Sequence, residues 1–240
     1  MMKIMFLIPV NTDFTQRKED ISAYLESYIS PDMQIEFVQV SQGFLSVESE
    51  LQGMVNGCHV VKAYLNRWDQ FDGVYVNCFD DPGVYPCREI GYLPVIGPYQ
   101  AAVSTASAIA ERIGIITTDV AGILSEERKA RKEGVAEKIV SIRPVNLPVS
   151  DIRSEQEVLT ETLFQLCKEM VEKDRVSAIC LGCTAMFYVA DKLKDKLQQE
   201  RVQVNIIEPI ANGINVLQTL IRQNLTNAVP TEIDFDTSIL

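Results

Sequence analysis

VYVNCFDDPG (residues 74–83) and AICLGCTAM (residues 178–186) are the two stretches that decide the fold. Each is a short apolar run, typical of a buried strand, that leads to a cysteine and then to residues that favour a turn or the start of a helix. The pattern occurs once in each half of the chain. This indicates an internal repeat.

The chain around each stretch alternates short apolar runs with longer amphipathic ones, which predicts parallel sheets covered by helices on both faces. In the first half we expect strands over 3–10, 34–40 and 72–78 and helices over 14–29 and 48–67. A linking segment over 93–99 leads to a small-residue helix near 101–111. The series then restarts, with strands over 112–118, 138–145, 176–183 and 202–209 and helices over 120–133, 155–174, 185–200 and 210–224.

The repeat predicts an α/β protein with two pseudo-symmetric lobes. Cys78 and Cys183 each follow the corresponding strand of their half, at the edge where open parallel sheets form ligand crevices. Two similar lobes that face each other would place both thiols across one cleft, which we therefore expect to be the active site.

Two such thiols suit the inversion of a carbon acid next to a carbonyl group. One sulfur, as thiolate, removes the proton from one face, and the other, as thiol, delivers a proton to the opposite face. Cys78 and Cys183 are therefore the candidate catalytic residues.

The enolate oxygen formed in such a reaction needs hydrogen-bond donors that are already in place. Backbone N–H groups around Phe79, Asp80 and Thr184 are candidates, because they follow the cysteines directly. Other polar side chains that end strands at the same rim are Asn11, Thr12, Thr117 and Thr118. No glycine-rich phosphate loop is present, so we expect no cofactor.

Composition excludes several other classes. The 240 residues carry 22 basic and 33 acidic side chains, a net charge of −11, which argues against nucleic-acid binding. A single histidine, His59, excludes a multi-histidine metal site, and we expect no metal. No apolar run is long enough to span a membrane. We expect a cytoplasmic homo-oligomer that acts on a small molecule.

Several motifs together resemble one known family. LGCTAM (181–186) is similar to the second cysteine motif of the aspartate/glutamate racemase superfamily, and NCFDDPG (77–83) to the first cysteine motif of its hydantoin racemase branch. Three further stretches also resemble this branch: PVNT (9–12), GIITT (114–118) and the strand that ends in Ile207-Glu208-Pro209. The resemblance covers nearly the whole chain.

The resemblance implies two pseudo-symmetric lobes, 1–98 plus 209–240 and 99–208, because the last helix of the family returns to the first lobe. It also implies cofactor-independent two-base racemisation, with Cys78 and Cys183 as the acid/base pair. Asn11, Thr117 and Thr118 would line the substrate.

The chain departs from the hydantoin racemase pattern at three places. Asp80 stands where glycine is usual, GPYQA (97–101) replaces GIAEA, and Thr184-Ala185 follows the second cysteine instead of Ala-Gly. A 5-substituted hydantoin, allantoin or a free amino acid therefore all remain candidate substrates.

We interpret the other cysteines as structural residues, and His59 as a structural or surface residue and not as a catalytic base. Cys58, Cys87, Cys167 and Cys180 are interpreted as small apolar residues. The Cys180–Cys183 spacing is CxxC, but Cys180 lies within a strand and no second CxxC exists, which disfavours a redox or zinc site.

Racemisation is the function that the two cysteines favour, and two alternatives stay open. A decarboxylase or cis-trans isomerase could use the same scaffold with one reactive cysteine. A protein that binds a ligand without turnover is the third possibility, for which Asp80 is the motivating feature, although Asp80 and Asp81 could instead cap the helix that follows.

Overall fold

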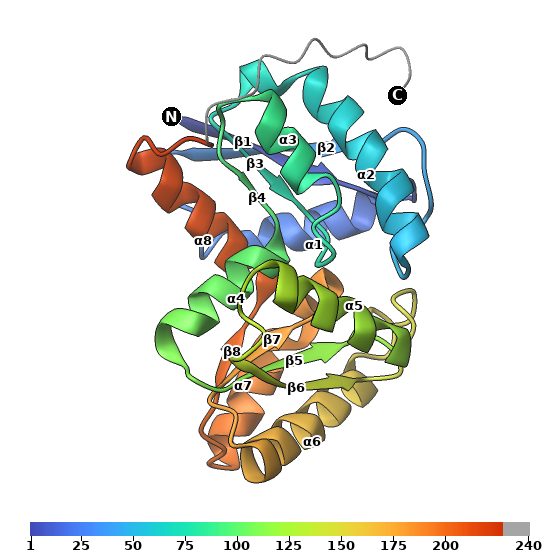
Figure 1. Ribbon diagram of the computed structural model, residues 1–240, viewed down its shortest axis with the longest axis vertical. Helices are drawn as coiled ribbons and strands as arrows, with labels where there is room; N and C mark the ends of the chain where they lie inside the picture. Colours follow the sequence, from blue (N-terminus) through green and yellow to red (C-terminus); the bar gives the residue numbers. More distant parts are fainter. Residues whose placement is uncertain (228–240) are drawn as a thin grey trace. The chain divides into compact units, whose positions relative to one another are not determined.

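The computed structural model describes residues 1–227 and contains two α/β units, each built on a four-stranded parallel sheet covered by helices (Figure 1). This confirms the predicted fold class. The first unit comprises Met1–Pro98 and the chain from Gly213 onward, and the second comprises Tyr99–Asn212. The first lobe expected from the sequence extends into residues 228–240, which lie outside the described part of the chain.

The sheet of the first unit has the strand order β2-β1-β3-β4. Its strands are β1 (Met2–Ile8), β2 (Met33–Gln39), β3 (Gly73–Val76) and β4 (Val95–Ile96). Its helices are α1 (Thr15–Leu25), α2 (Glu50–Leu65), the short 3-10 turn η1 (Trp68–Gln70), α3 (Val84–Ile90) and most of α8 (Pro209–Arg222).

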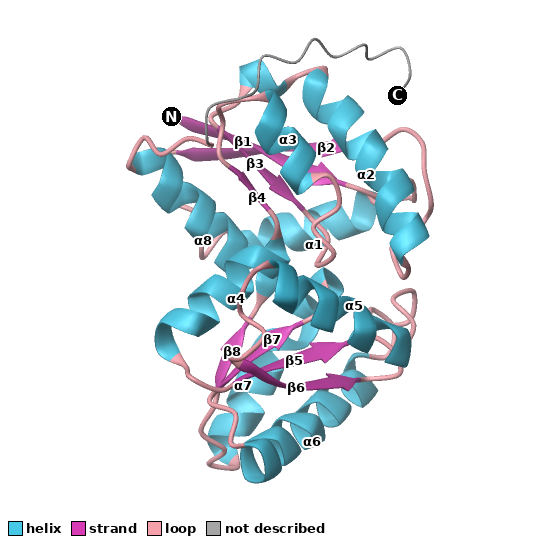
Figure 2. Cartoon of the chain, in the orientation of Figure 1, coloured by secondary structure: helices cyan, strands magenta, loops and turns pink. Residues whose placement is uncertain are grey.

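Helices cover both faces of this sheet (Figure 2), and alternate residues of its central strands pack on opposite faces. Met5, Leu7, Val74 and Val76 belong to one core cluster with the buried residues of α2 and α3. The ring of Tyr75 points to the other face, where it contacts Gly213 of α8. Helices on both faces explain why β1 is a continuous apolar run, fully buried from Ile4 to Ile8.

The second unit repeats the architecture with the strand order β6-β5-β7-β8. Its strands are β5 (Ile113–Thr117), β6 (Ile139–Pro144), β7 (Ala178–Leu181) and β8 (Asn205–Ile207). Its helices are α4 (Pro98–Ile109), α5 (Val120–Lys132), α6 (Gln156–Asp174), the 3-10 turn η2 (Thr184–Met186) and α7 (Phe187–Gln199).

Here too the sheet is covered on both faces. Ile116, Ile179 and Leu181 pack in one cluster with the apolar stripes of α6 and α7, while α4 and α5 cover the opposite face (Figure 2). No helix within residues 1–227 has the length and apolarity that crossing a bilayer would demand.

Besides η1, two short elements were not assigned residue ranges from the sequence. The segment treated as a link contains β4, the edge strand of the first sheet, and α3 lies between β3 and β4. The third expected strand also ends earlier than predicted, at Val76, so that Cys78 lies in the turn that follows it. Both short elements belong to the repeat, since β4 corresponds to β8.

Helix α8 packs closely on the first sheet because it carries a glycine where it meets Tyr75. A methyl group at Gly213 would overlap the Tyr75 ring, which is fully buried and has no room to move. We expect Gly213→Ala to lower the free energy of unfolding by about 1 to 2 kcal/mol, because overpacking exceeds the gain in helix propensity.

Urea denaturation monitored by circular dichroism measures this loss. Asn215→Ala on the exposed side of α8 is the control and should stay within about 0.5 kcal/mol of the parent. Equal effects of the two variants would contradict the close packing of α8 on Tyr75.

Candidate active site

Cys78 lies two residues beyond β3, in a tight turn at the carboxyl end of the first sheet. The last ladder pair joins Leu7 of β1 to Val76, and the Asn77 N–H then donates to Leu7 O at 2.8 Å. The Asp81 N–H donates to Cys78 O at 3.0 Å, which closes the turn. The Cys78 side chain is partly exposed.

Cys183 lies two residues beyond β7 in the second unit. Ile116 of β5 pairs with Leu181, and the Gly182 N–H donates to Ile116 O at 2.7 Å. Cys183 is the residue that precedes η2, and its carbonyl accepts from the Met186 N–H at 3.0 Å. Its side chain is also partly exposed.

The two cysteines therefore occupy equivalent positions of the repeat. Each follows the third strand of its unit after one extra hydrogen bond to the first strand. In both sheets the strand order reverses between these two strands, which is where open α/β sheets bind ligands.

Asn11 and Thr12 follow β1 and lie on a segment whose backbone is held by side chains. Gln39 Nε2 donates to Val10 O at 2.9 Å and to Thr12 O at 2.6 Å. The Asn11 side chain is exposed and that of Thr12 is partly exposed. The first unit thus brings Cys78, Asn11 and Thr12 to the carboxyl ends of adjacent strands.

Asn56, which the sequence analysis did not single out, holds the same region from α2. Its side chain is fully buried. Nδ2 donates to Pro9 O at 2.8 Å and to Phe44 O at 3.1 Å, and Oδ1 accepts from the Phe44 N–H at 2.8 Å. Because Phe44 O also accepts from the Asn11 N–H at 3.1 Å, one amide connects two loops at this rim.

The carboxylates of Asp80 and Asp81 both lie in close contact with glycines. A side chain at Gly53 of α2 would come within 2.5 Å of Asp80 Oδ2, and one at Gly97 would overlap the Asp81 carboxylate. Helix α3 begins after Gly83, which has a positive φ of 75° and makes no side-chain cap. Gly83 thus holds the N-cap position of α3.

Phe79 and Thr184 follow the two cysteines directly. The Phe79 side chain is 4% exposed, so only its backbone is placed to meet a ligand. Thr184 is partly exposed and begins η2.

Thr117 and Thr118 end β5 differently. The Thr117 side chain is 3% exposed and its hydroxyl lies against Gly122 of α5, whereas Thr118 is partly exposed. A side chain at Gly182 would come within 2.6 Å of Ile116 O, so the residue before Cys183 is confined to glycine by this close approach.

Glu208 follows β8 at the carboxyl end of the second sheet, and its carboxylate stabilises the start of a helix. The side chain is 4% exposed, and its two oxygens accept from the Ile210 and Ala211 N–H groups, each at 2.8 Å. It therefore caps α8, as Asp119 caps α5 through the Gly122 N–H.

Three of the other cysteines are buried, and burial keeps their thiols protonated and unreactive. Burial raises the pKa of Cys167 to about 12. The pKa values of Cys87 and Cys180 are also well above the ordinary range, chiefly because of desolvation, and the Glu126 carboxylate adds to the effect at Cys180. Cys58 is exposed on α2.

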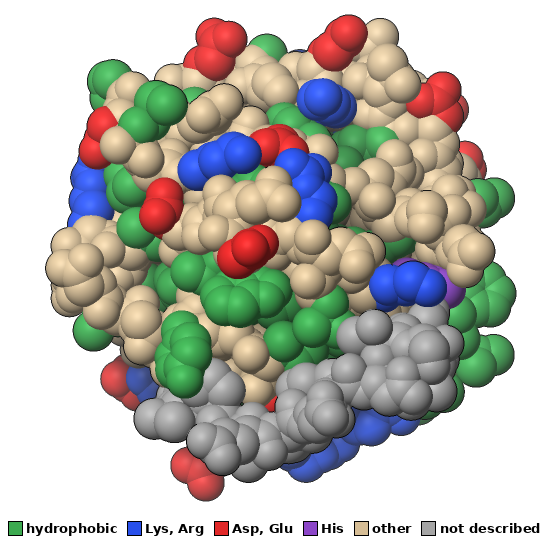
Figure 3. Space-filling model, turned by 90° about the horizontal axis from the view of Figure 1, so that it is seen from above, with side chains coloured by type: hydrophobic (Ala, Val, Ile, Leu, Met, Phe, Trp, Pro, Cys, Tyr) green, Lys and Arg blue, Asp and Glu red, His purple; other side chains and the backbone are tan. Residues whose placement is uncertain are grey.

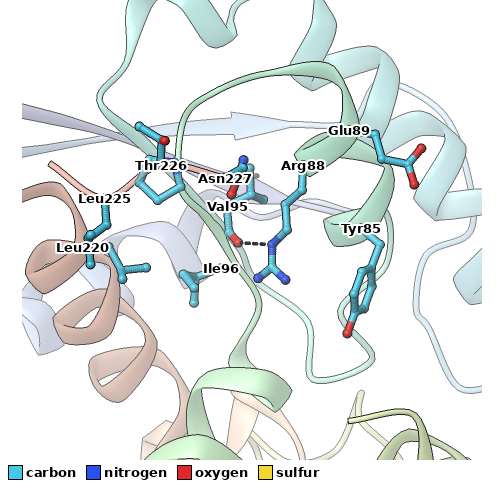
Figure 4. A pocket seen from close by; sticks show the side chains of 10 residues that line it. Tyr85, Arg88, Glu89, Val95, Ile96, Leu220, Leu225, Thr226 and Asn227 are labelled. Atoms are coloured by element: carbon cyan, nitrogen blue, oxygen red, sulfur yellow. Dashed lines mark hydrogen bonds between the residues drawn. The ribbon is translucent and has the colours of Figure 1, made fainter. Parts of the chain in front are cut away.

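The described residues contain no group of three or more histidine, cysteine or acidic side chains that could hold a metal ion. One pocket of about 450 Å³ lies in the first unit between α3, β4 and the end of α8 (Figure 4). None of the predicted site residues lines it. Arg88 there donates through Nε to Val95 O at 2.8 Å and so covers an acceptor on the edge strand.

Charges are mixed on the surface. In Figure 3, acidic and basic side chains are interspersed instead of forming a field of one sign. An example in the first unit is Glu36, which pairs with both Arg67 and Lys3, with the Lys3 Nζ–Oε2 distance at 2.8 Å.

The two α/β units share one architecture, and each carries a partly exposed cysteine two residues beyond its third strand. Residues 11–217 match the Asp/Glu/hydantoin racemase family, so the chain belongs to that family. This confirms the resemblance found in the sequence.

Curated relatives and solved structures agree with this assignment. The chain is 28% identical to hydantoin racemase of Pseudomonas sp. (strain NS671), over 92% of this chain and 86% of the relative, and 26% identical to hydantoin racemase of Paenarthrobacter aurescens, over 85% of each. Allantoin racemase from Klebsiella pneumoniae has the same fold, with a TM-score of 0.87 at 22% identity over 98% of this chain and 95% of that one.

The loops that carry Asn11 and Phe44 depend on Asn56. In Asn56→Ala, the carbonyls of Pro9 and Phe44 lose a buried donor. We therefore expect the free energy of unfolding to fall by about 2 to 3 kcal/mol in urea denaturation. Asn66→Ala, an exposed position at the end of the same helix, should change it by less than about 0.5 kcal/mol. A similar small loss for Asn56→Ala would show that the amide does not hold the loops.

Thiol alkylation separates the cysteines by burial and pKa. The thiolate is the reactive form, and raised pKa values keep Cys87, Cys167 and Cys180 protonated below about pH 9. Native protein treated with iodoacetamide at pH 8 should be modified at Cys58, Cys78 and Cys183 only, as read by peptide mass spectrometry. Labelling becomes complete in urea, which serves as the control. Native labelling of Cys180, or protection of Cys78 and Cys183, would contradict this assignment.

Proposed function

We propose that this protein is a cofactor-independent racemase that inverts a stereocentre next to a carbonyl group, with Cys78 and Cys183 as the acid/base pair. The observation that carries the proposal is their equivalence in the repeat, each two residues beyond the third strand of its unit. The names of the relatives, hydantoin racemase and allantoin racemase, suggest 5-substituted hydantoins or allantoin as substrates, with free amino acids as the further class.

In this mechanism one sulfur begins as thiolate and takes the proton from the stereocentre. The electron pair of the broken C–H bond forms the enolate, and the other thiol gives its proton to the opposite face of the same carbon. The proton count is unchanged and the two sulfurs have exchanged roles. The mechanism requires the two rims to meet one substrate from opposite sides.

Local structure favours a negative charge at Cys183. It precedes η2, which continues directly into α7, and backbone N–H groups at such a start stabilise a thiolate. The carbonyl oxygen of the substrate would be stabilised by donors at the same rims, for which the backbone at Phe79, Asp80 and Thr184 and the side chains of Asn11, Thr12, Thr117 and Thr118 are the candidates. One such donor typically lowers the barrier by about 3 kcal/mol.

Other activities share the fold. Arylmalonate decarboxylase and the maleate isomerase of Pseudomonas putida S16 have TM-scores of 0.58 and 0.68 at 15% and 14% identity. A thiol in both repeats favours inversion, because it provides a proton donor and acceptor on each side of the carbon.

Isotope exchange tests the proposal. Single enantiomers of hydantoins, allantoin and amino acids are incubated with the protein in deuterium oxide, and label uptake is followed together with optical rotation. We expect exchange at the stereocentre with loss of rotation for at least one class. Saturable binding without exchange, or loss of CO₂, would contradict racemisation.

Cysteine variants test the acid/base pair. Cys78→Ser and Cys183→Ser should each lower kcat/KM for racemisation at least roughly hundredfold, since one proton transfer is lost. Each single variant should still wash label into one enantiomer only. Cys58→Ser is the matched control and should racemise like the parent, because its thiol is exposed on α2. Normal racemisation by either site variant would overturn the two-thiol mechanism.

A further inference from the structure

Asn77, directly before Cys78, carries a buried acceptor that the fold does not use. The residue is 7% exposed, and its backbone N–H is satisfied by Leu7 O. Its side-chain oxygen Oδ1 is buried and has no hydrogen-bond partner in the part of the chain that is described. The hydrogen bonds within the described part of the chain therefore do not explain why an amide side chain stands at this position.

Leaving such an acceptor unpaired is unfavourable by about 1 to 3 kcal/mol, and an apolar side chain of similar size would avoid it. The repeat shows that the backbone does not need an amide here. Gly182 holds the equivalent position before Cys183 and makes the same backbone hydrogen bond, to Ile116 O. A hydrogen-bond donor from outside the chain would account for this difference.

We propose that Asn77 determines substrate specificity by accepting, through Oδ1, a hydrogen bond from an N–H attached to the stereocentre of the substrate. This inference rests on the proposed function, because it places Asn77 at the site of Cys78. Asn77 and Cys78 are the first two residues beyond β3, where the strand order of the sheet reverses, so both residues lie at the edge where open α/β sheets bind ligands.

The chemistry favours a neutral N–H over an ammonium group. A buried ammonium needs an anionic partner, whereas an amide oxygen satisfies a neutral donor. The substrate class that follows is a cyclic or open ureide, in which an amide-type N–H adjoins the carbon that exchanges its proton, and a free amino acid is disfavoured.

A matched pair of ligands tests Asn77 directly. A 5-alkylhydantoin has an N–H at N1, next to the stereocentre C5, and its N1-methyl derivative lacks only that donor. We expect the parent protein to prefer the N–H compound by at least about tenfold in kcat/KM. In Asn77→Leu this preference should fall to within about twofold, through a higher KM for the N–H compound.

Stability distinguishes this role from a structural one. Asn77→Leu removes an unsatisfied acceptor, so its Tm should equal or exceed that of the parent while discrimination is lost. Asn215→Leu, on the exposed side of α8, should keep the preference unchanged. A lower Tm with the preference retained would overturn the inference and make the amide structural, for instance as the ligand of a bound water.

Calorimetric binding of the same two ligands separates this inference from the proposed function. Binding that prefers the N–H compound in the parent protein and loses the preference in Asn77→Leu would support the role of Asn77 even if no racemisation occurs. Racemisation with equal preference for the two ligands would overturn the role of Asn77 and leave the proposed function standing. Absence of binding and of turnover for both ligands would overturn both.

Discussion

The structure depends on the register of one parallel strand pair in each unit. The Asn77 N–H donates to Leu7 O, and the Gly182 N–H donates to Ile116 O. Each of these hydrogen bonds extends a ladder by one residue beyond its last pair and fixes the point at which the chain leaves the sheet. Because side chains alternate along a strand, a slip of one residue in either register would exchange the side chains that pack on the two buried faces and would shift the point at which the cysteine follows the sheet.

A few polar side chains hydrogen-bond to backbone groups and so hold the loops and helix ends next to the sheets. Asn56 and Gln39 hold the segment after β1, while Glu208 caps α8 and Asp119 caps α5. In each case the side chain satisfies backbone groups that would otherwise be unpaired. The loops at the rims are therefore held before any ligand arrives, as catalysis by positioned groups requires.

Long periodic elements could be predicted from the sequence, whereas short ones could not. The runs that became β1 and α6 have enough residues to show a period, and they form where expected. Strand β4 has two residues and α3 has seven, too few for a hydrophobic period to emerge. The two cysteines were found because a repeat makes them visible together, although each lies in a turn and not at the end of its strand.

Roles that depend on distant partners left no local signal. Asn56 is a polar residue in the middle of a helix, and its importance comes from Pro9, 47 positions earlier in the chain. The direction of the Asp80 side chain likewise depends on Gly53, which lies on a different element. Nothing in the neighbouring residues distinguishes these contacts from those of a solvated side chain.

The two halves share their backbone design and differ in the side chains around each thiol. Before the cysteines stand Asn77 and Gly182, and two residues after them stand Asp80 and Ala185. Gly182 is confined to glycine by its approach to Ile116 O, so the second unit has no room there for a polar side chain. Under the proposed function, the two thiols would supply similar chemistry, and recognition of the substrate by the residues beside them would come from the first unit. A symmetric reaction at the carbon is compatible with this, because the groups bonded to a stereocentre are themselves all different.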